Sequence, residues 1–158
     1  MLFRSIPLFF DLRTLGLTDT YLAIAMPQVA QSIAFGTFWL RAQFRATPTS
    51  LLEAAALDGA GPLQALLRIL VPASRPAIVT MVVLVFMWTW NEFLIALIMA
   101  PGGRLRTAPL GLANFQGQYT SETALLAAGA VIVALPTVIL FLFLQRHFIR
   151  GMLEGVAK

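Results

Sequence analysis

The sequence predicts an all-α membrane protein, a polytopic helix bundle with three full transmembrane helices in one domain, residues 1–158. Of its 158 residues, 59% are hydrophobic and only 11% are charged, whereas a soluble domain carries about 25% charged residues. Three apolar segments reach the roughly 20 residues that a helix needs to cross the hydrocarbon core. They are residues 21–40, 77–100 and 123–144. A soluble bundle of buried helices is the alternative, and the scarcity of charge disfavours it.

The positions of the basic residues predict the orientation of these segments. Seven basic residues lie in the connection 41–76 and the tail 145–158, and four lie in residues 1–20 and 101–122. Cytoplasmic loops of membrane proteins carry an excess of Lys and Arg. The connection 41–76 and the C-terminus are therefore expected in the cytoplasm, with 101–122 as an outer loop. Because the basic residues are spread over the segment ends instead of one face, no nucleic-acid partner is expected.

The polar stretch from Ser50 to Pro72, between the first two apolar segments, predicts a two-helix hairpin. Ser50 and Glu53 have the spacing of a capping box at a helix start. Gly59 can take the left-handed conformation that ends a helix. Pro62 suits the first turn of a second helix, which Pro72 is expected to end. The alternative is an interfacial hairpin that only connects two spans.

The residue spacing in this hairpin resembles the cytoplasmic coupling loop of permease subunits in binding-protein-dependent ABC importers. That pattern reads Glu-Ala-Ala, three residues, Gly, nine residues, Ile, one residue, Leu, Pro, and here Val71 replaces the Leu. The resemblance implies that the hairpin docks on ABC ATPase subunits and carries their motion into the membrane. ATP hydrolysis is expected in that partner, because this chain has no phosphate-binding GxxxxGK loop. The residues expected in ATPase coupling are Glu53, Ala54, Ala55, Asp58, Gly59, Ala60, Ile69 and Pro72.

The run Trp-Thr-Trp-Asn-Glu-Phe at 88–93, together with Leu-Asp-Gly-Ala at 57–60, looks like the sugar-type permeases of the maltose and glycerol-3-phosphate systems. The resemblance implies the fold of a type I ABC importer permease, which moves a sugar or a related polyol or glycerol phosphate across the bacterial inner membrane by alternating access. A homologous permease subunit and an extracytoplasmic solute-binding protein are the other expected partners. Family members usually have six spans. The chain is therefore expected to be a C-terminal portion, with residues 1–20 as the remnant of a preceding helix and outer loop.

Polar side chains within the apolar segments are candidates for the solute path. Trp88, Asn91 and Glu92 fall on one face of a predicted helix, and a carboxylate at the bilayer centre costs about 2.5–3.5 kcal/mol on insertion scales. An aromatic ring beside an amide and a carboxylate suits a sugar. Gln28 and Gln31 form a second polar stripe. For both groups the alternative is that they brace neighbouring helices.

The predicted outer loop contains three candidate residues for contact with a partner protein. Gly111, Asn114 and Gln116 would face the solute-binding protein by resemblance, and a plain polar connector is the alternative.

A membrane-embedded enzyme is disfavoured, because Glu92 is the only acidic residue in a predicted span and the only histidine, His147, lies at the opposite side. No catalytic residue, cofactor or metal site is expected. An inactive or regulatory membrane fragment, unable to transport alone, is the alternative function.

Overall fold

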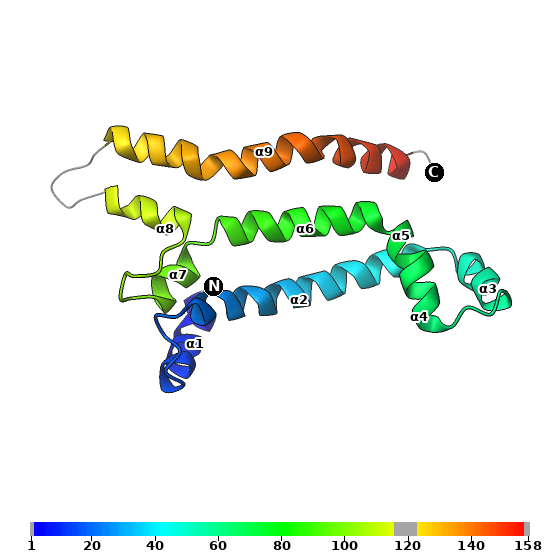
Figure 1. Cartoon of the computed structure of the whole chain (residues 1–158), viewed down its shortest axis with the longest axis horizontal. Helices are drawn as coiled ribbons and strands as arrows, with labels where there is room; N and C mark the ends of the chain where they lie inside the picture. Colours follow the sequence, from blue (N-terminus) through cyan, green and yellow to red (C-terminus); the bar gives the residue numbers. More distant parts are fainter. Residues whose placement is uncertain (1, 116–122, 157–158) are drawn as a thin grey trace. The chain divides into compact units, whose positions relative to one another are not determined.

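The structure, a computed structural model, describes residues 2–115 and 123–156. Within those residues the chain forms helices joined by turns, without a strand, which confirms the predicted all-α class (Figure 1). Between the helical stretches Pro62–Ala73 and Arg75–Trp90 the chain bends by 75°. The elements are α1 (Leu2–Thr14), α2 (Tyr21–Ala46), α3 (Thr49–Leu57), α4 (Pro62–Ala65), the π-helical segment η1 (Leu66–Leu70), α5 (Val71–Ala73), α6 (Arg75–Trp90), α7 (Leu94–Met99), α8 (Ala108–Leu112), the 3-10 turn η2 (Ala113–Phe115) and α9 (Thr123–Val156).

Two compact units divide the chain. The first unit comprises residues 1–31 and 86–144, and the second comprises residues 32–85 and 145–158. The predicted hairpin lies wholly in the second unit, and the predicted outer loop lies wholly in the first. Each unit is described by itself below.

The best-buried part of the first unit is a small apolar cluster where α1 packs on α7. Leu12 of α1, Ala23 of α2 and Met99 of α7 form its centre, and the side chains of Ala23 and Met99 are fully buried. Around them pack the partly buried side chains of Leu8, Phe9, Leu17, Ile95 and Ile98. Residues 1–20 therefore contribute a helix and a loop to the main core of this unit.

Asp19 joins the loop before α2 to the loop after α7. Its backbone lies in the left-handed region, with φ +58°, which is uncommon for a residue with a side chain. The N–H of Asp19 donates to the Met99 carbonyl at 3.0 Å, and its Oδ1 accepts the N–H of Gly102 at 2.7 Å. A Cβ at Gly102 would lie 2.8 Å from that oxygen, so glycine permits the close approach. We call Leu12, Asp19, Ala23, Met99 and Gly102 the α1–α7 cluster.

In the described part of the chain, one helix is long and apolar enough to cross a membrane alone. It is the stretch Thr123–Phe143 of α9, in which no residue of the most apolar window is buried. The pair Pro62–Ala73 and Arg75–Trp90 meets the same criterion only when counted together. Helix α2 is long enough to cross a membrane, but it is not apolar enough to meet this criterion, because Gln28 and Gln31 interrupt its apolar run. Three full crossings therefore stay a prediction.

The predicted helix over 77–100 is broken in the structure. Helix α6 ends at Trp90, the backbone is irregular from Asn91 to Phe93, and α7 begins at Leu94. The indole N–H of Trp90 donates to the carbonyl of Val133 in α9 at 2.9 Å. The end of α6 is thus attached to α9 by an interaction that the hydrophobic pattern does not reveal.

Candidate functional site

The first helix of the hairpin, α3, begins two residues earlier than predicted and without a side-chain cap. Pro48 occupies the N-cap position, and no side chain accepts a hydrogen bond there. The capping box of Ser50 and Glu53 is therefore wrong, because Ser50 lies inside the helix, one residue after its first residue, Thr49. The carboxylate of Glu53 is exposed instead of folded back on the helix start.

The end of α3 has the predicted geometry. Gly59 takes the left-handed conformation with φ +78°. The N–H of Ala60 donates to the Ala55 carbonyl at 2.9 Å, and the N–H of Gly59 donates to the Ala56 carbonyl at 3.0 Å. These two bonds form a Schellman motif, which satisfies the last carbonyls of a helix. The chain therefore reverses at Gly59 by backbone geometry alone.

The second half of the hairpin begins as predicted and ends later. Pro62 stands in the first turn of α4, where its missing N–H has no cost. Pro72 does not end the helix, which continues to Ala73. The preceding π-helical segment, in which the N–H of Val71 donates to the Leu66 carbonyl, explains the difference. A proline ring clashes with the carbonyl four residues earlier, and the wider π turn moves that carbonyl aside.

The hairpin, defined as residues 47–74, presents apolar side chains to its surroundings. Leu57 is 90% exposed, Leu63 68% and Leu67 57%. Exposed large apolar side chains such as these are suited to a contact with a protein or a membrane. A shallow pocket of about 410 Å³ lies on this surface, lined by Gly61, Pro62, Leu63, Gln64, Leu67 and Arg68.

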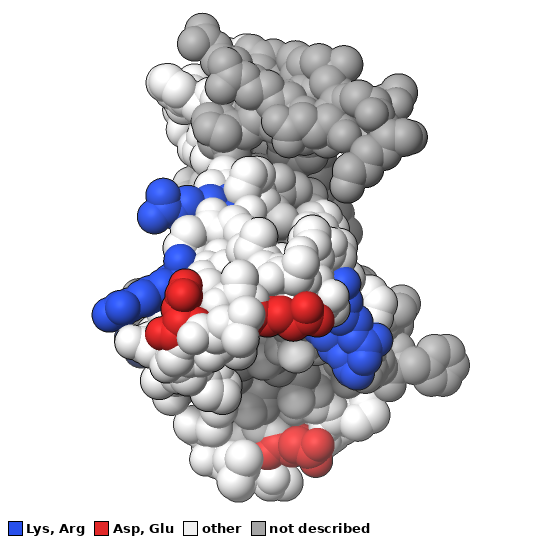
Figure 2. Space-filling view, turned by 90° about the vertical axis from the view of Figure 1, so that its right-hand side faces the viewer, with Lys and Arg blue, Asp and Glu red and all other residues white. Residues whose placement is uncertain are grey.

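The predicted coupling residues fall into three groups by their exposure. Glu53, Ala54, Asp58 and Gly59 are exposed, whereas Ala55 is only 6% exposed and packs inside the unit. Figure 2 views the side that carries α3 and α4, where charged side chains are sparse and most of the described surface is uncharged. A docking partner would meet a mainly uncharged surface with a few charges. The three remaining residues, Ala60, Ile69 and Pro72, are half-buried.

In the first unit, two predicted solute-path residues make hydrogen bonds to the backbone at the break between α6 and α7. Asn91 Nδ2 donates to the Met87 carbonyl at 2.7 Å. Glu92 Oε1 accepts the N–H of Ile95 at 2.7 Å, as a capping side chain does at a helix start. The predicted single helical face through Trp88, Asn91 and Glu92 is therefore wrong, because the helix ends before Asn91.

The other predicted residues lie in different surroundings. Gln28 is buried and Gln31 is exposed, so the two glutamines of the expected stripe do not share one environment. Gly111 lies in α8 and the backbone of Asn114 in η2, while Gln116 lies outside the described residues. Asp19 has a well-defined structural role that the sequence analysis did not assign. The signal for it was a turn sequence, Gly-Leu-Thr-Asp-Thr, directly before a long helix.

Metal chemistry receives no support from the described side chains. None of the clusters that His, Cys, Asp and Glu form in residues 2–115 and 123–156 has the three members that could hold a metal ion. The arrangement at the hairpin is suited to mechanical contact with a partner.

The family of binding-protein-dependent transport system inner membrane components matches residues 1–154. The chain belongs to this family. It is similar to the trehalose transport system permease protein SugB of Mycobacterium tuberculosis, at 36% identity over 96% of this chain and 56% of SugB. It is also similar to the probable ABC transporter permease protein YurM of Bacillus subtilis, at 39% identity over 97% of this chain and 51% of YurM.

A third relative is the trehalose/maltose transport system permease protein MalG of Thermococcus litoralis, with 36% identity over 96% of this chain and 55% of MalG. The chain spans about half the length of these curated relatives. The predicted membership of the sugar-type permease family is confirmed. These relatives are permease proteins of transport systems and not enzymes, as expected for this chain.

Proposed function

We propose that this chain forms part of the transmembrane subunit of an ATP-driven importer that moves a sugar, or a related polyol or glycerol phosphate, across the bacterial inner membrane. Two ATPase subunits, a homologous permease subunit and an extracytoplasmic solute-binding protein are its partners. The trehalose and maltose names of two relatives support the substrate class. The subunit crosses the bilayer several times, with the hairpin and the C-terminus in the cytoplasm.

The hairpin is the observation that carries this proposal. Its sequence spacing is that of a coupling loop, and its shape is fixed by the Schellman motif at Gly59 and by Pro62. Exposed apolar side chains lie beside the reversal together with Asp58, and Leu57 is the most exposed of them. A rigid projection with an exposed apolar surface suits the transmission of motion from an ATPase. ATP-driven closure of the ATPase subunits would push on Glu53, Ala54 and the Gly59 turn and so alternate the access of the solute path.

The hydrogen bonds at the α6–α7 break refine the proposed solute path. Asn91 and Glu92 hold the irregular backbone, so we assign them to bracing the path. Trp88 and Gln31 are exposed and are the better candidates for solute contact. The assignment predicts that a glutamine at position 92 preserves transport, because it keeps the oxygen that accepts the Ile95 N–H.

Cysteine cross-linking tests the docking role directly, because the chain has no cysteine of its own. Ala54→Cys should cross-link to the ATPase subunit, since Ala54 is exposed on α3. Ala55→Cys is the matched control at the neighbouring position, because the side chain of Ala55 is buried and a cysteine there should react poorly. Equal capture from both positions, or capture from neither, would contradict docking through this face.

The inactive or regulatory fragment is the second candidate. We retain this candidate because the chain covers only about half the length of each relative. Uptake by a strain whose only version of this permease is the 158-residue chain decides between the two. Accumulation of labelled trehalose or maltose supports an active subunit, whereas ATPase cross-linking without uptake supports the fragment.

A further inference from the structure

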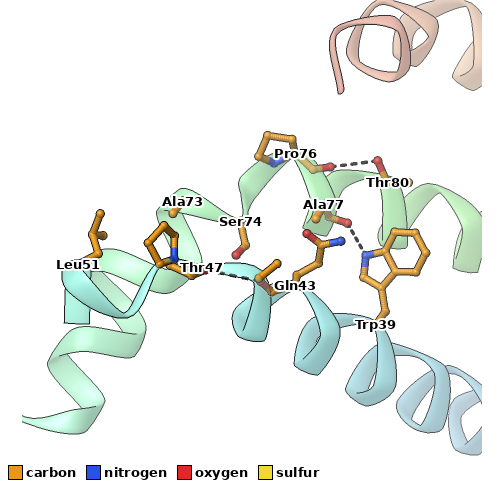
Figure 3. A pocket seen from close by; sticks show the side chains of 11 residues that line it. Trp39, Gln43, Thr47, Leu51, Ala73, Ser74, Pro76, Ala77 and Thr80 are labelled. Carbon is orange, nitrogen blue, oxygen red and sulfur yellow. Dashed lines mark hydrogen bonds between the residues drawn. The ribbon is translucent and has the colours of Figure 1, made fainter. Parts of the chain in front are cut away.

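The two helices that flank the hairpin are joined by a side-chain hydrogen bond in the second unit. The indole N–H of Trp39, in α2, donates to the Ala77 carbonyl, in the first turn of α6, at 3.0 Å. Figure 3 shows this bond beside the pocket at the base of the hairpin. A carbonyl oxygen can accept two hydrogen bonds, so Ala77 can keep its helical bond as well.

The position of this bond matters because the chain changes direction next to it. Ala77 follows Ser74 by three residues, and at Ser74 the helix bends by 75°. On the other side, Trp39 lies two turns before Thr47, where α2 has ended. A force on the hairpin therefore acts as a torque on both points where the hairpin leaves the longer helices. The Trp39–Ala77 bond resists the separation of those two points.

The neighbouring contacts hold the Trp39 ring and the two backbones in place. The rings of Phe35 and Trp39 have centroids 5.6 Å apart. One helical turn before Trp39, Gly36 is buried against Met81. A Cβ at Gly36 would lie 3.2 Å from the Met81 sulfur. Glycine thus allows the two helices to approach closely enough for the indole to reach the carbonyl.

Beyond this bond the hairpin base is separated from the helices by an open pocket. Its volume is about 550 Å³. Figure 3 shows Leu51 and Thr47 on one side, and Ala77 and Thr80 on the other. The lining residues are Trp39, Gln43, Ala46, Thr47, Pro48, Leu51, Ala73, Ser74, Pro76, Ala77 and Thr80.

We propose that Trp39 is a positioning residue for coupling. By holding α2 to the first turn of α6, it makes both ends of the hairpin move together, so that a push on the hairpin moves the helices instead of spreading them apart. The pocket gives the hairpin base space for this motion. The inference rests on the proposed function, because it assumes that the hairpin receives its force from an ATPase.

The substitution Trp39→Phe isolates the hydrogen bond, because phenylalanine keeps an aromatic ring beside Phe35 and lacks the N–H donor. Trp90→Phe is the matched control, since it removes the same kind of indole-to-carbonyl bond, to Val133 in the first unit. Spin labels at Ala42→Cys and Val79→Cys, both exposed positions of the second unit, report the spacing of α2 and α6 in the full chain without any partner.

We expect a broader distance distribution in Trp39→Phe and an unchanged one in Trp90→Phe. In the assembled transporter, Trp39→Phe should retain the Ala54→Cys cross-link and ATP hydrolysis but move about fivefold less solute per ATP, the size of one neutral hydrogen bond. An unchanged distribution overturns the proposal, and so does unchanged solute per ATP with a broadened one. A missing cross-link in the parent protein counts instead against the proposed function, while the spin-label result still decides the role of the bond.

Discussion

The α1–α7 cluster and the hairpin are held together in opposite ways. In the cluster, fully buried Met99 and Ala23 meet Leu12, and Asp19 forms two hydrogen bonds to residues far away in the sequence. In the hairpin, the shape comes from local backbone bonds at Gly59 and from a proline at a helix start, while the apolar side chains stay exposed.

This difference shows how one small chain separates stability from contact. The cluster uses its apolar side chains for its own core, so it contributes to the stability of the fold. The hairpin specifies its shape without a large core, so its apolar side chains remain available for a partner. Substitutions should therefore affect stability in one region and partner binding in the other.

The largest expected effect is on the core of the cluster. Met99→Ala should lower the free energy of unfolding by about 3 kcal/mol, because a fully buried methionine leaves a cavity. Leu57→Ala, at the most exposed leucine of the hairpin, should change it by less than about 0.5 kcal/mol. Denaturant unfolding of both variants in detergent measures this contrast. Similar losses of stability in the two variants would abolish the distinction between the regions.

The second effect tests whether the Asp19 bonds belong to the stabilising region. Asp19→Ala should cost about 2 kcal/mol, because alanine is strained at φ +58° and the Gly102 N–H loses its acceptor. Asp19→Asn is the matched control, since asparagine tolerates this conformation and offers an amide oxygen. Thermal unfolding of both variants is the measurement. An alanine variant as stable as the asparagine variant would contradict the role given to Asp19.

A smaller effect is expected at the hairpin reversal. Gly59→Ala should cost about 1–2 kcal/mol locally, since alanine resists the left-handed conformation. No atom lies within 4 Å of a Cβ at Gly59, so the cause is backbone strain and not a clash. Hydrogen exchange of the Ala60 amide should accelerate, whereas Gly59→Asn should retain most of its protection. Equal exchange in the two variants would show that the left-handed turn is not what holds the hairpin.

The smallest expected effect concerns Glu92, at the break between α6 and α7 in the first unit. Glu92→Ala should cost about 1 kcal/mol, the usual size for a lost capping bond. Glu92→Gln keeps an oxygen acceptor and should be close to neutral. Hydrogen exchange of the Ile95 amide distinguishes them. If the glutamine variant exchanges as fast as the alanine variant, the carboxylate charge has a role that capping does not explain.

The sequence allowed the helical class, the family and the hairpin reversal to be predicted, because these depend on local patterns. The helix end at Gly59 and the helix start at Pro62 were predicted correctly, because each residue type favours the conformation that its position needs. The break after Trp90 was not predicted, because apolar residues on both sides of Asn91 gave a continuous pattern that hid two side chains bonded to the backbone. The predicted end of the helix at Pro72 also failed, since a π-helical segment has no clear sequence signature.

Long-range polar contacts were beyond the sequence for a different reason. Asp19 and Gly102 are 83 positions apart, Trp39 and Ala77 are 38 apart, and Trp90 and Val133 are 43 apart. Their pairing depends on how helices pack, which a single sequence does not specify. The candidate site was therefore predicted best where it is local, in the hairpin, and least where it joins separate helices.

The bond from Trp90 to Val133 has a consequence for how α9 sits among lipid chains. A smooth apolar rod in a bilayer can spin about its long axis at little cost, and the stretch Thr123–Phe143 is almost uniformly apolar. One indole hydrogen bond to a single carbonyl breaks that freedom, because only one azimuth brings Val133 to Trp90. The same azimuth carries the hydroxyl of Thr137, one turn further on, out of contact with solvent.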